Sequence, residues 1–187
     1  MTTLETRSAA RAPSGLLRRL RRLAPPRFSL MAAAGVLAIV AAACSSALSG
    51  DAPPVSVQTF EHGDFSLDRV QGKAVVVNFW FPSCPPCVAE MPDLQAAYEE
   101  HRADGVEFIG VQLLGLDTAE DGERFLTDLG ITYPAGPDTD DRIWRAYKVT
   151  GFPTTVFLDR EHNVVKTWTG LLDRTRLEEF IGRALES

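Results

Sequence analysis

Apolar residues in the C-terminal three quarters of the chain follow strand and helix spacings in turn. The longest strand pattern is Ala74–Trp80, which is apolar at every position except Asn78 and so predicts a central strand buried on both faces. Val106–Val111 predicts the next strand. Two further strands are predicted around a turn, at Thr154–Leu158 and Val164–Thr169.

Helical spacing appears in four segments. Apolar residues at Met91, Leu94 and Tyr98 predict a helix that starts after Ala74–Trp80 and runs to about His101. The other helices are predicted at Thr118–Leu129, which is capped by Thr118 and Asp121 and stopped by Gly130, at Asp140–Tyr147 and at Thr175–Leu185.

Two shorter features complete the expected domain. Thr59–Glu61 and Phe65–Leu67 predict an N-terminal hairpin around a His-Gly-Asp turn. Tyr133-Pro134 leads into an acidic turn before the third helix. Strands alternate with helices first, and a hairpin and a terminal helix follow. This order predicts an α/β fold with a central mixed β-sheet flanked by helices on both faces.

The first 44 residues have the composition of an export signal. Residues 1–27 are basic, and Phe28–Ala43 is an uncharged run of 16 residues, which is short for a membrane span but suits a signal peptide. Small residues then precede Cys44. This resembles a bacterial lipoprotein cleavage box, although Ala41 stands where that pattern prefers leucine, and implies lipidation of Cys44. The alternative is an uncleaved anchor, with the apolar run extended to Leu48.

This organisation places the domain outside the cytoplasmic membrane. Residues 1–44 form the signal or anchor, residues 45–56 read as a flexible, polar tether, and residues 57–187 form the domain. In either alternative the arginines stay on the cytoplasmic side of the membrane, and the domain lies on the opposite side. We therefore expect an anchored protein on the extracytoplasmic face of the cell membrane.

Charge is divided unevenly along the chain. Seven of the 19 Lys and Arg residues, but only one of the 25 acidic residues, lie in residues 1–44, which leaves 12 basic and 24 acidic residues in the remainder. A domain with this balance is not expected to bind nucleic acid, because a phosphate backbone requires a basic surface.

Cys84 and Cys87 carry the clearest chemistry, in a Cys-Pro-Pro-Cys sequence between a strand and a helix. This order places the Cys84 sulfur at a helix N-terminus, where free N–H groups and the helix dipole favour a thiolate. Cys87 lies one turn on, close enough to form a disulfide. If Cys44 is lipidated, these two form the remaining pair. A disulfide that closes so short a loop constrains the unfolded chain little, so a redox role is favoured over a structural one.

A second motif, Thr150–Thr154, contains Gly-Phe-Pro-Thr. Together the strand, the Cys-x-x-Cys helix and this proline motif resemble the thioredoxin fold. More narrowly, residues 57–185 resemble the TlpA and ResA type of extracytoplasmic thiol–disulfide oxidoreductases in the AhpC/TSA and redoxin superfamily. The matching stretches are Val77–Trp80, Cys84–Pro92, Gly151–Thr155 and Asp117–Tyr147, the last expected as a central αβ insert.

The resemblance assigns roles to individual residues. It implies a cis Pro153 beside the disulfide and a Phe152 backbone that pairs with an extended substrate segment; an ordinary trans proline is the alternative. Cys84 is the expected nucleophile, and Cys87 resolves the mixed disulfide. Glu90, one turn after Cys87, is assigned to accept its proton, directly or through water; the alternative is a solvated surface carboxylate.

Two positions depart from related sequences. Ser83 precedes the first cysteine, where the family usually has tryptophan, and this changes the surface around the nucleophile. Asn78 stands where cytoplasmic thioredoxin has a buried aspartate, and an asparagine cannot accept a proton. The TlpA and ResA type also lacks that aspartate and carries a glutamate at the position of Glu90.

These observations predict an enzyme that reduces disulfides in exported proteins. By resemblance, apocytochrome c is a typical substrate, and the reductant arrives through a membrane electron carrier. The same chemistry run as a disulfide-forming oxidase is the main alternative, because the sequence does not reveal the relative stability of the dithiol and disulfide forms. A thiol peroxidase is less favoured, since Phe81 rather than threonine stands three residues before Cys84. A tethered metallochaperone is the last alternative.

Other polar residues are expected to have no catalytic role. His62, His101 and His162 fall at turns or at a helix end, where we expect them to be exposed, and none accompanies the cysteines at metal-ligand spacing. We expect a monomer without a metal or a cofactor. A solvated turn is expected for three acidic residues, Asp138, Asp140 and Asp141.

Overall fold

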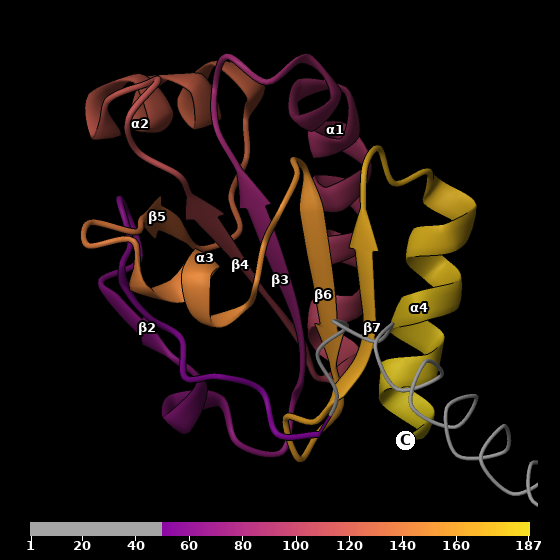
Figure 1. The fold of residues 1–187 in the computed structure, drawn as a ribbon. Helices are drawn as coiled ribbons and strands as arrows, with labels where there is room; N and C mark the ends of the chain where they lie inside the picture. Colours follow the sequence, from indigo (N-terminus) through magenta and orange to yellow (C-terminus); the bar gives the residue numbers. More distant parts are fainter. Residues whose placement is uncertain (1–49) are drawn as a thin grey trace, which may run out of the picture. The chain divides into compact units, whose positions relative to one another are not determined.

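A computed structural model describes residues 50–187; the expected signal segment, with Cys44, lies outside the described residues. The described part contains a five-stranded mixed sheet with the strand order β5-β4-β3-β6-β7 (Figure 1). The expected α/β fold with a central mixed sheet is confirmed. The strands of this sheet are β3 (Ala74–Trp80), β4 (Val106–Gln112), β5 (Ala135–Pro137), β6 (Thr154–Leu158) and β7 (Val164–Thr169).

Helices cover both faces of this sheet. The four α-helices of the described residues are α1 (Pro85–His101), α2 (Ala119–Leu129), α3 (Arg142–Ala146) and α4 (Arg174–Glu186). Two short 3-10 helices, Leu67–Val70 and Arg102–Asp104, join other elements. No helix within residues 50–187 is long and apolar enough to cross a membrane.

The side chains of β3 divide the core into two apolar clusters. Every residue of β3 is buried, as its apolar run predicts. Val76 and Trp80 pack in a cluster that includes residues of α1, α2 and α4. Val75 and Val77 point to the opposite face and pack with α3 and the N-terminal hairpin. The sheet therefore lies between two layers.

The strand directions bring several chain segments to one edge of the sheet. β3 pairs parallel with β4 and antiparallel with β6, and β6 pairs antiparallel with β7. The C-terminal ends of β3, β4 and β7 therefore lie at the same edge as the N-terminal end of β6. We call this the β3 C-terminal edge; it is at the top of Figure 1, where α1 begins.

The ends of α2 follow the sequence prediction. The Thr118 hydroxyl accepts the backbone N–H of Asp121 (3.1 Å), and the Asp121 carboxylate accepts the backbone N–H of Thr118 (3.0 Å). This reciprocal pair is the capping box expected from the spacing. Gly130 ends the helix in the left-handed conformation, with φ of 66°, which glycine adopts without steric cost.

The N-terminal hairpin is confirmed, but its strands begin earlier than predicted. They are β1 (Ser56–Gln58) and β2 (Asp64–Ser66), paired antiparallel. The reason lies in Thr59, which begins the turn instead of the strand. Its hydroxyl donates to the Gly63 carbonyl (2.6 Å) and accepts the His62 N–H (2.9 Å). The sequence also did not locate β5 within the insert.

Three expectations of exposure are wrong, because Asp138 and His162 are buried and His101 is half-buried, with 16% of its side chain exposed. Asp138 is buried, because its carboxylate accepts the backbone N–H groups of Ile143 (2.9 Å) and Trp144 (3.0 Å) at the start of α3. Burial raises the pKa of Asp138, and these hydrogen bonds oppose the rise. His162 is buried as well, beneath the N-terminal segment of the domain.

Residues 50–55, which the sequence assigns to the tether, lie against the domain. The Ala52 N–H donates to the His162 carbonyl (2.9 Å), and the Tyr147 hydroxyl donates to the Pro53 carbonyl (2.8 Å). Val55 is buried in the second apolar cluster. The turn that holds this segment joins β6 to β7 at the edge opposite the β3 C-terminal edge.

Candidate active site

Cys84 and Cys87 form a disulfide at the N-terminus of α1, with 5.2 Å between their Cα atoms. Cys84 is the N-cap residue, and its sulfur accepts the backbone N–H of Cys87 (3.3 Å). Pro85 and Pro86 occupy the first helical turn, where a missing N–H costs little. After reduction, the same N–H and the helix dipole favour a thiolate at Cys84.

The two sulfurs differ in accessibility. Cys84 is 4% exposed, and Cys87 is completely buried. An external disulfide therefore meets Cys84 first, which supports Cys84 as the attacking residue and Cys87 as the resolving one.

Glu90 is buried in α1, one turn beyond Cys87, with only 1% of its surface exposed. One carboxylate oxygen accepts an N–H of the Asn78 side chain (2.9 Å), and the other accepts the backbone N–H of Leu172 (2.9 Å). Burial raises the pKa of Glu90 to about 7, and these two hydrogen bonds oppose the rise. The solvated alternative is wrong, and the group can exchange a proton near neutral pH.

Asn78 orients this carboxyl group, a role that the sequence analysis missed. Its side-chain amide donates to Glu90 and also to the Thr155 hydroxyl (3.0 Å), so it joins β3 and β6 to α1. The available signal was a polar residue in an otherwise apolar, buried strand. The contribution of Leu172 had no such signal, because any residue type supplies the same backbone N–H.

Phe152 and Pro153 lie at the start of β6, at the β3 C-terminal edge. The bond between them is cis, as expected. The Phe152 ring contacts the Phe81 ring edge to face, with centroids 5.3 Å apart. Both rings pack against the apolar cluster that contains Cys84 and Cys87. The structure thus places the proline motif beside the dithiol segment, 69 residues earlier in the chain.

A sequence model of the AhpC/TSA family matches residues 48–167. The chain belongs to the AhpC/TSA family. It is similar to the thiol-disulfide oxidoreductase ResA of Oceanobacillus iheyensis, with 34% identity over 115 residues, which are 62% of this chain and 59% of that protein. It is also similar to ResA of Bacillus subtilis, with 30% identity over 131 residues, 70% of this chain and 72% of that protein.

Solved structures share the fold of this chain. A putative thiol:disulfide interchange protein DsbE from Chlorobium tepidum superposes with a TM-score of 0.68 and 27% identity, covering 74% of this chain and 99% of that one. StoA from Bacillus subtilis superposes with a TM-score of 0.62 and 26% identity, covering 68% of this chain and 96% of that one. With its helix-capping dithiol, this AhpC/TSA chain is a thiol–disulfide oxidoreductase of the ResA and DsbE type.

Ser83, the departure from the family pattern, is bound to the central insert. Its backbone N–H (3.1 Å) and its hydroxyl (2.7 Å) both donate to the Asp117 carboxylate. This contact fixes the loop before α2 next to the residue that precedes the nucleophile. The sequence identified Ser83 but offered no signal for its partner, which lies 34 residues away.

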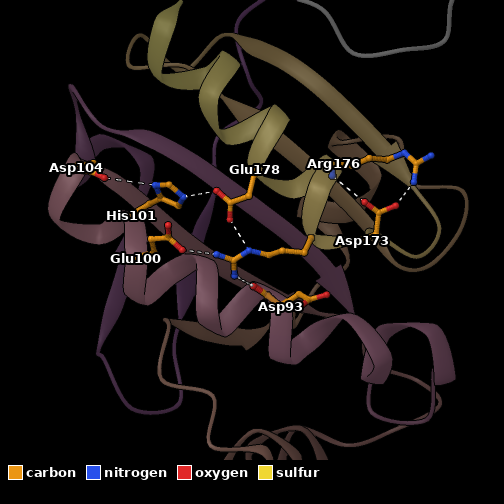
Figure 2. A network of polar contacts seen from close by, with 8 residues as sticks. Asp93, Glu100, His101, Asp104, Asp173, Arg176 and Glu178 are labelled. Atoms are coloured by element: carbon orange, nitrogen blue, oxygen red, sulfur yellow. Dashed lines mark hydrogen bonds and ion pairs between the residues drawn. The ribbon is translucent and has the colours of Figure 1, made fainter.

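A second polar cluster lies at the other end of α1. Ligand atoms of Glu100, His101 and Glu178 come within 4.8 Å of one another. The Arg174 guanidinium binds Glu100 (2.5 Å) and Glu178 (2.7 Å), and His101 also contacts Glu178 (2.7 Å), as Figure 2 shows. A helix rises ~1.5 Å per residue, so this network lies roughly 24 Å from Cys84. We assign it to the packing of α1 against α4.

Proposed function

We propose that this protein is a membrane-tethered oxidoreductase on the extracytoplasmic face, which reduces disulfides in exported proteins. The observation that carries the proposal is the buried Glu90 one turn beyond a helix-capping Cys84–Cys87 pair. The signal-like composition of residues 1–44 and the position of Cys44 support the location. The names of its relatives, which describe disulfide oxidoreduction and interchange, support the chemistry.

The exchange proceeds in two displacements. The Cys84 thiolate attacks one sulfur of the substrate disulfide, and the second substrate sulfur leaves as a thiolate. Cys87 then attacks the Cys84 sulfur, which breaks the mixed disulfide and releases the remaining substrate thiolate. Two electrons pass from the enzyme dithiol to the substrate. The proton of Cys87 passes to Glu90 and from there to a released thiolate.

Partners follow from this chemistry and from the family resemblance. We propose an extended segment of an exported protein, of the apocytochrome c type, bound along the backbone of Phe152 and beside Pro153. A membrane electron carrier would return the Cys84–Cys87 disulfide to the dithiol. Lipidated Cys44 would hold the protein, as a monomer, at the membrane.

Trapping tests the substrate. Cys87→Ser removes the resolving sulfur, so a mixed disulfide between Cys84 and the substrate accumulates. We expect exported, cysteine-containing proteins in the trapped fraction. Cys84→Ser is the matched control, and the same proteins must be absent from it. A trap that captures no exported protein contradicts the proposed substrate class.

The reduction potential tests the direction. A value near that of thioredoxin, ~−270 mV, supports a reductase, whereas a value near the oxidant end, ~−120 mV, identifies a disulfide-forming oxidase. Equilibration of the purified domain with glutathione buffers, read by alkylation of free thiols, gives this value.

Removal of Cys44 tests the anchor. If the cysteine is lipidated, the wild type incorporates labelled fatty acid and Cys44→Ala does not. A wild-type protein that is membrane-bound without incorporated fatty acid identifies the uncleaved anchor instead.

A further inference from the structure

Two exposed leucines lie on loops that are hydrogen-bonded to the active site. Leu116 is 76% exposed and directly precedes Asp117, whose carboxylate binds the backbone and side chain of Ser83. The loop therefore holds Leu116 beside the residue that precedes Cys84. It leaves the C-terminal end of β4, at the β3 C-terminal edge (Figure 1).

Leu171 lies on the other side of the dithiol, in the loop between β7 and α4. It is 52% exposed, although both of its neighbours are bound to the site. The Gly170 N–H donates to the Pro153 carbonyl (2.8 Å), and the Leu172 N–H donates to Glu90 (2.9 Å). Hydrogen bonds thus hold this loop between the proline motif and the buried acid, with the Leu171 side chain toward solvent.

Single exposed leucines are common on protein surfaces and need no explanation by themselves. Here, however, residues 50–187 contain three exposed large hydrophobic residues. The third, Leu129, is 39% exposed and lies in the last turn of α2, outside the loops that are hydrogen-bonded to the active site. The strand order places the loops of the other two, after β4 and after β7, on opposite sides of β3, whose C-terminal end leads to Cys84. An apolar group on each side suits a bound chain that crosses Cys84.

The surface next to Leu116 is also acidic. A groove of about 320 Å³ beside Ser83 is lined by Asp117, Asp121 and Asp128, with Arg124 as its basic side chain. Arg124 is paired with Asp121 (3.5 Å), which leaves a negative balance. A basic group of a bound chain would complement this groove.

We propose that Leu116 and Leu171 are docking contacts for the polypeptide that carries the substrate disulfide. They select a cysteine with apolar residues on both sides and a basic residue on the side of the Ser83 groove. The selection rests on the proposed function, since it describes the substrate of the same sulfur. Small disulfides are too short to reach both leucines, so the contacts accelerate the reaction only with polypeptides.

Peptide disulfides test this docking surface. The probe is a peptide with one cysteine flanked by leucines, present as a mixed disulfide with thionitrobenzoate. Reduced enzyme attacks the peptide sulfur through Cys84 and releases thionitrobenzoate, which has the lower thiol pKa, and Cys87 then releases the peptide thiol. The second-order rate of dye release is compared with that for the symmetrical dye disulfide, which has no peptide.

We expect Leu116→Ser and Leu171→Ser each to slow the reaction with the leucine peptide about three- to tenfold, because each removes part of one buried leucine contact. Leu129→Ser is the matched control and is expected to leave this rate unchanged. All three variants should react with the symmetrical dye disulfide at the wild-type rate. Replacing both peptide leucines by serines removes both contacts and should slow the wild type to the rate of a Leu116→Ser, Leu171→Ser double variant.

Charge gives a second comparison. With a lysine in the peptide, Asp128→Asn should lower the rate about two- to threefold at low salt and much less at high salt, because screening weakens the attraction. Asp68→Asn changes an aspartate at the opposite edge and should have no effect. A peptide with glutamate in place of lysine should react more slowly with the wild type than with Asp128→Asn.

Several results would contradict the proposal that Leu116 and Leu171 are docking contacts. They are a loss no larger in the two leucine variants than in Leu129→Ser, an equal loss with the symmetrical dye disulfide, or an effect confined to one of the two leucines. These outcomes are distinct from failure of the proposed function, which would appear as a Cys87→Ser trap without exported proteins. Circular dichroism confirms that each variant is folded.

Discussion

Glu90 shows how the environment changes the chemistry of one residue. A glutamate on the surface of the first helix would be ionised at neutral pH and would have no access to a buried sulfur. In the folded domain, burial raises its pKa from an ordinary value near 4.5 to about 7. Helix α1 places it one turn from Cys87, the residue that loses a proton in the proposed resolving step.

The raised pKa of Glu90 predicts a stability that depends on pH. The folded state retains the Glu90 proton up to about pH 7, whereas the unfolded state loses it near 4.5. The stabilisation is therefore complete below pH 4.5 and is lost as the pH rises through 7. Between pH 4.5 and 8 the free energy of unfolding should fall by about 3 kcal/mol relative to Glu90→Gln.

Urea denaturation of the oxidised protein across this pH range measures the difference. Glu120→Gln, a change at an exposed glutamate of α2, is the control and should run parallel to the wild type. Parallel curves for the wild type and Glu90→Gln would show that Glu90 does not titrate in this range.

The same residue predicts the pH profile of the resolving step. Glu90→Gln cannot accept the Cys87 proton, so decay of the mixed disulfide should slow about tenfold or more. The inflection near pH 7 in the wild-type rate should disappear. Single-turnover reduction of a peptide disulfide, followed from pH 5 to 9, separates this step from the initial attack. An unchanged profile would remove Glu90 from the mechanism.

At the scale of elements, α2 depends on a close approach to β4. Gln112 at the end of β4 is fully buried, and its amide donates to the Thr118 carbonyl at the start of α2 (2.8 Å). Gly122 gives this side chain its space, since a Cβ there would lie 2.1 Å from the Gln112 Oε1 atom. Glycine is therefore retained inside the helix for packing, against its low helix propensity.

Replacing either of two helical glycines by alanine should change the free energy of unfolding in opposite directions. Gly122→Ala gains helix propensity but displaces Gln112, so the free energy of unfolding should fall by about 1 to 2 kcal/mol. Gly182→Ala in α4 meets no atom within 4 Å and should stabilise the protein by up to about 1 kcal/mol. Thermal and urea denaturation measure both. Equal gains at the two sites would contradict the packing role of Gly122.

At the scale of the whole domain, polar contacts join the first and last helices. Arg174 of α4 reaches Glu100 of α1 and Glu178 of its own helix, and it also donates to the Asp93 carbonyl (3.3 Å), as drawn in Figure 2. His101 meets Glu178 from the other side. The closing helix is thus bound to the helix that begins at Cys84.

Loss of Arg174 should weaken this connection. Arg174→Gln leaves two carboxylates without their shared cation, and we expect the free energy of unfolding to fall by about 1 kcal/mol at low salt, with a smaller loss at high salt because the groups are partly exposed. Arg176→Gln breaks a pair with Asp173 near the start of the same helix and should cost less than ~0.5 kcal/mol. Equal losses in both variants would show that the network does not couple α1 to α4.

Local patterns were sufficient to predict the elements. The apolar run of Ala74–Trp80 and the capping residues of α2 act within a few residues of chain, so their physics is visible in the sequence. The exceptions were short elements stabilised from outside. β5 is three residues long and forms by pairing with β4, and the hairpin shifted because Thr59 bonds across its own turn.

By itself, the sequence determined the dithiol at a helix N-terminus, the proline motif and the order of strands and helices, since each depends on residue type and local spacing. Only the tertiary structure decided the environment of Glu90 and of Ser83. The partners that orient Glu90 lie 12 and 82 residues away, and that of Ser83 lies 34 residues away. Such contacts follow from the folding of the sheet and the helices around it, which brings distant segments to one edge.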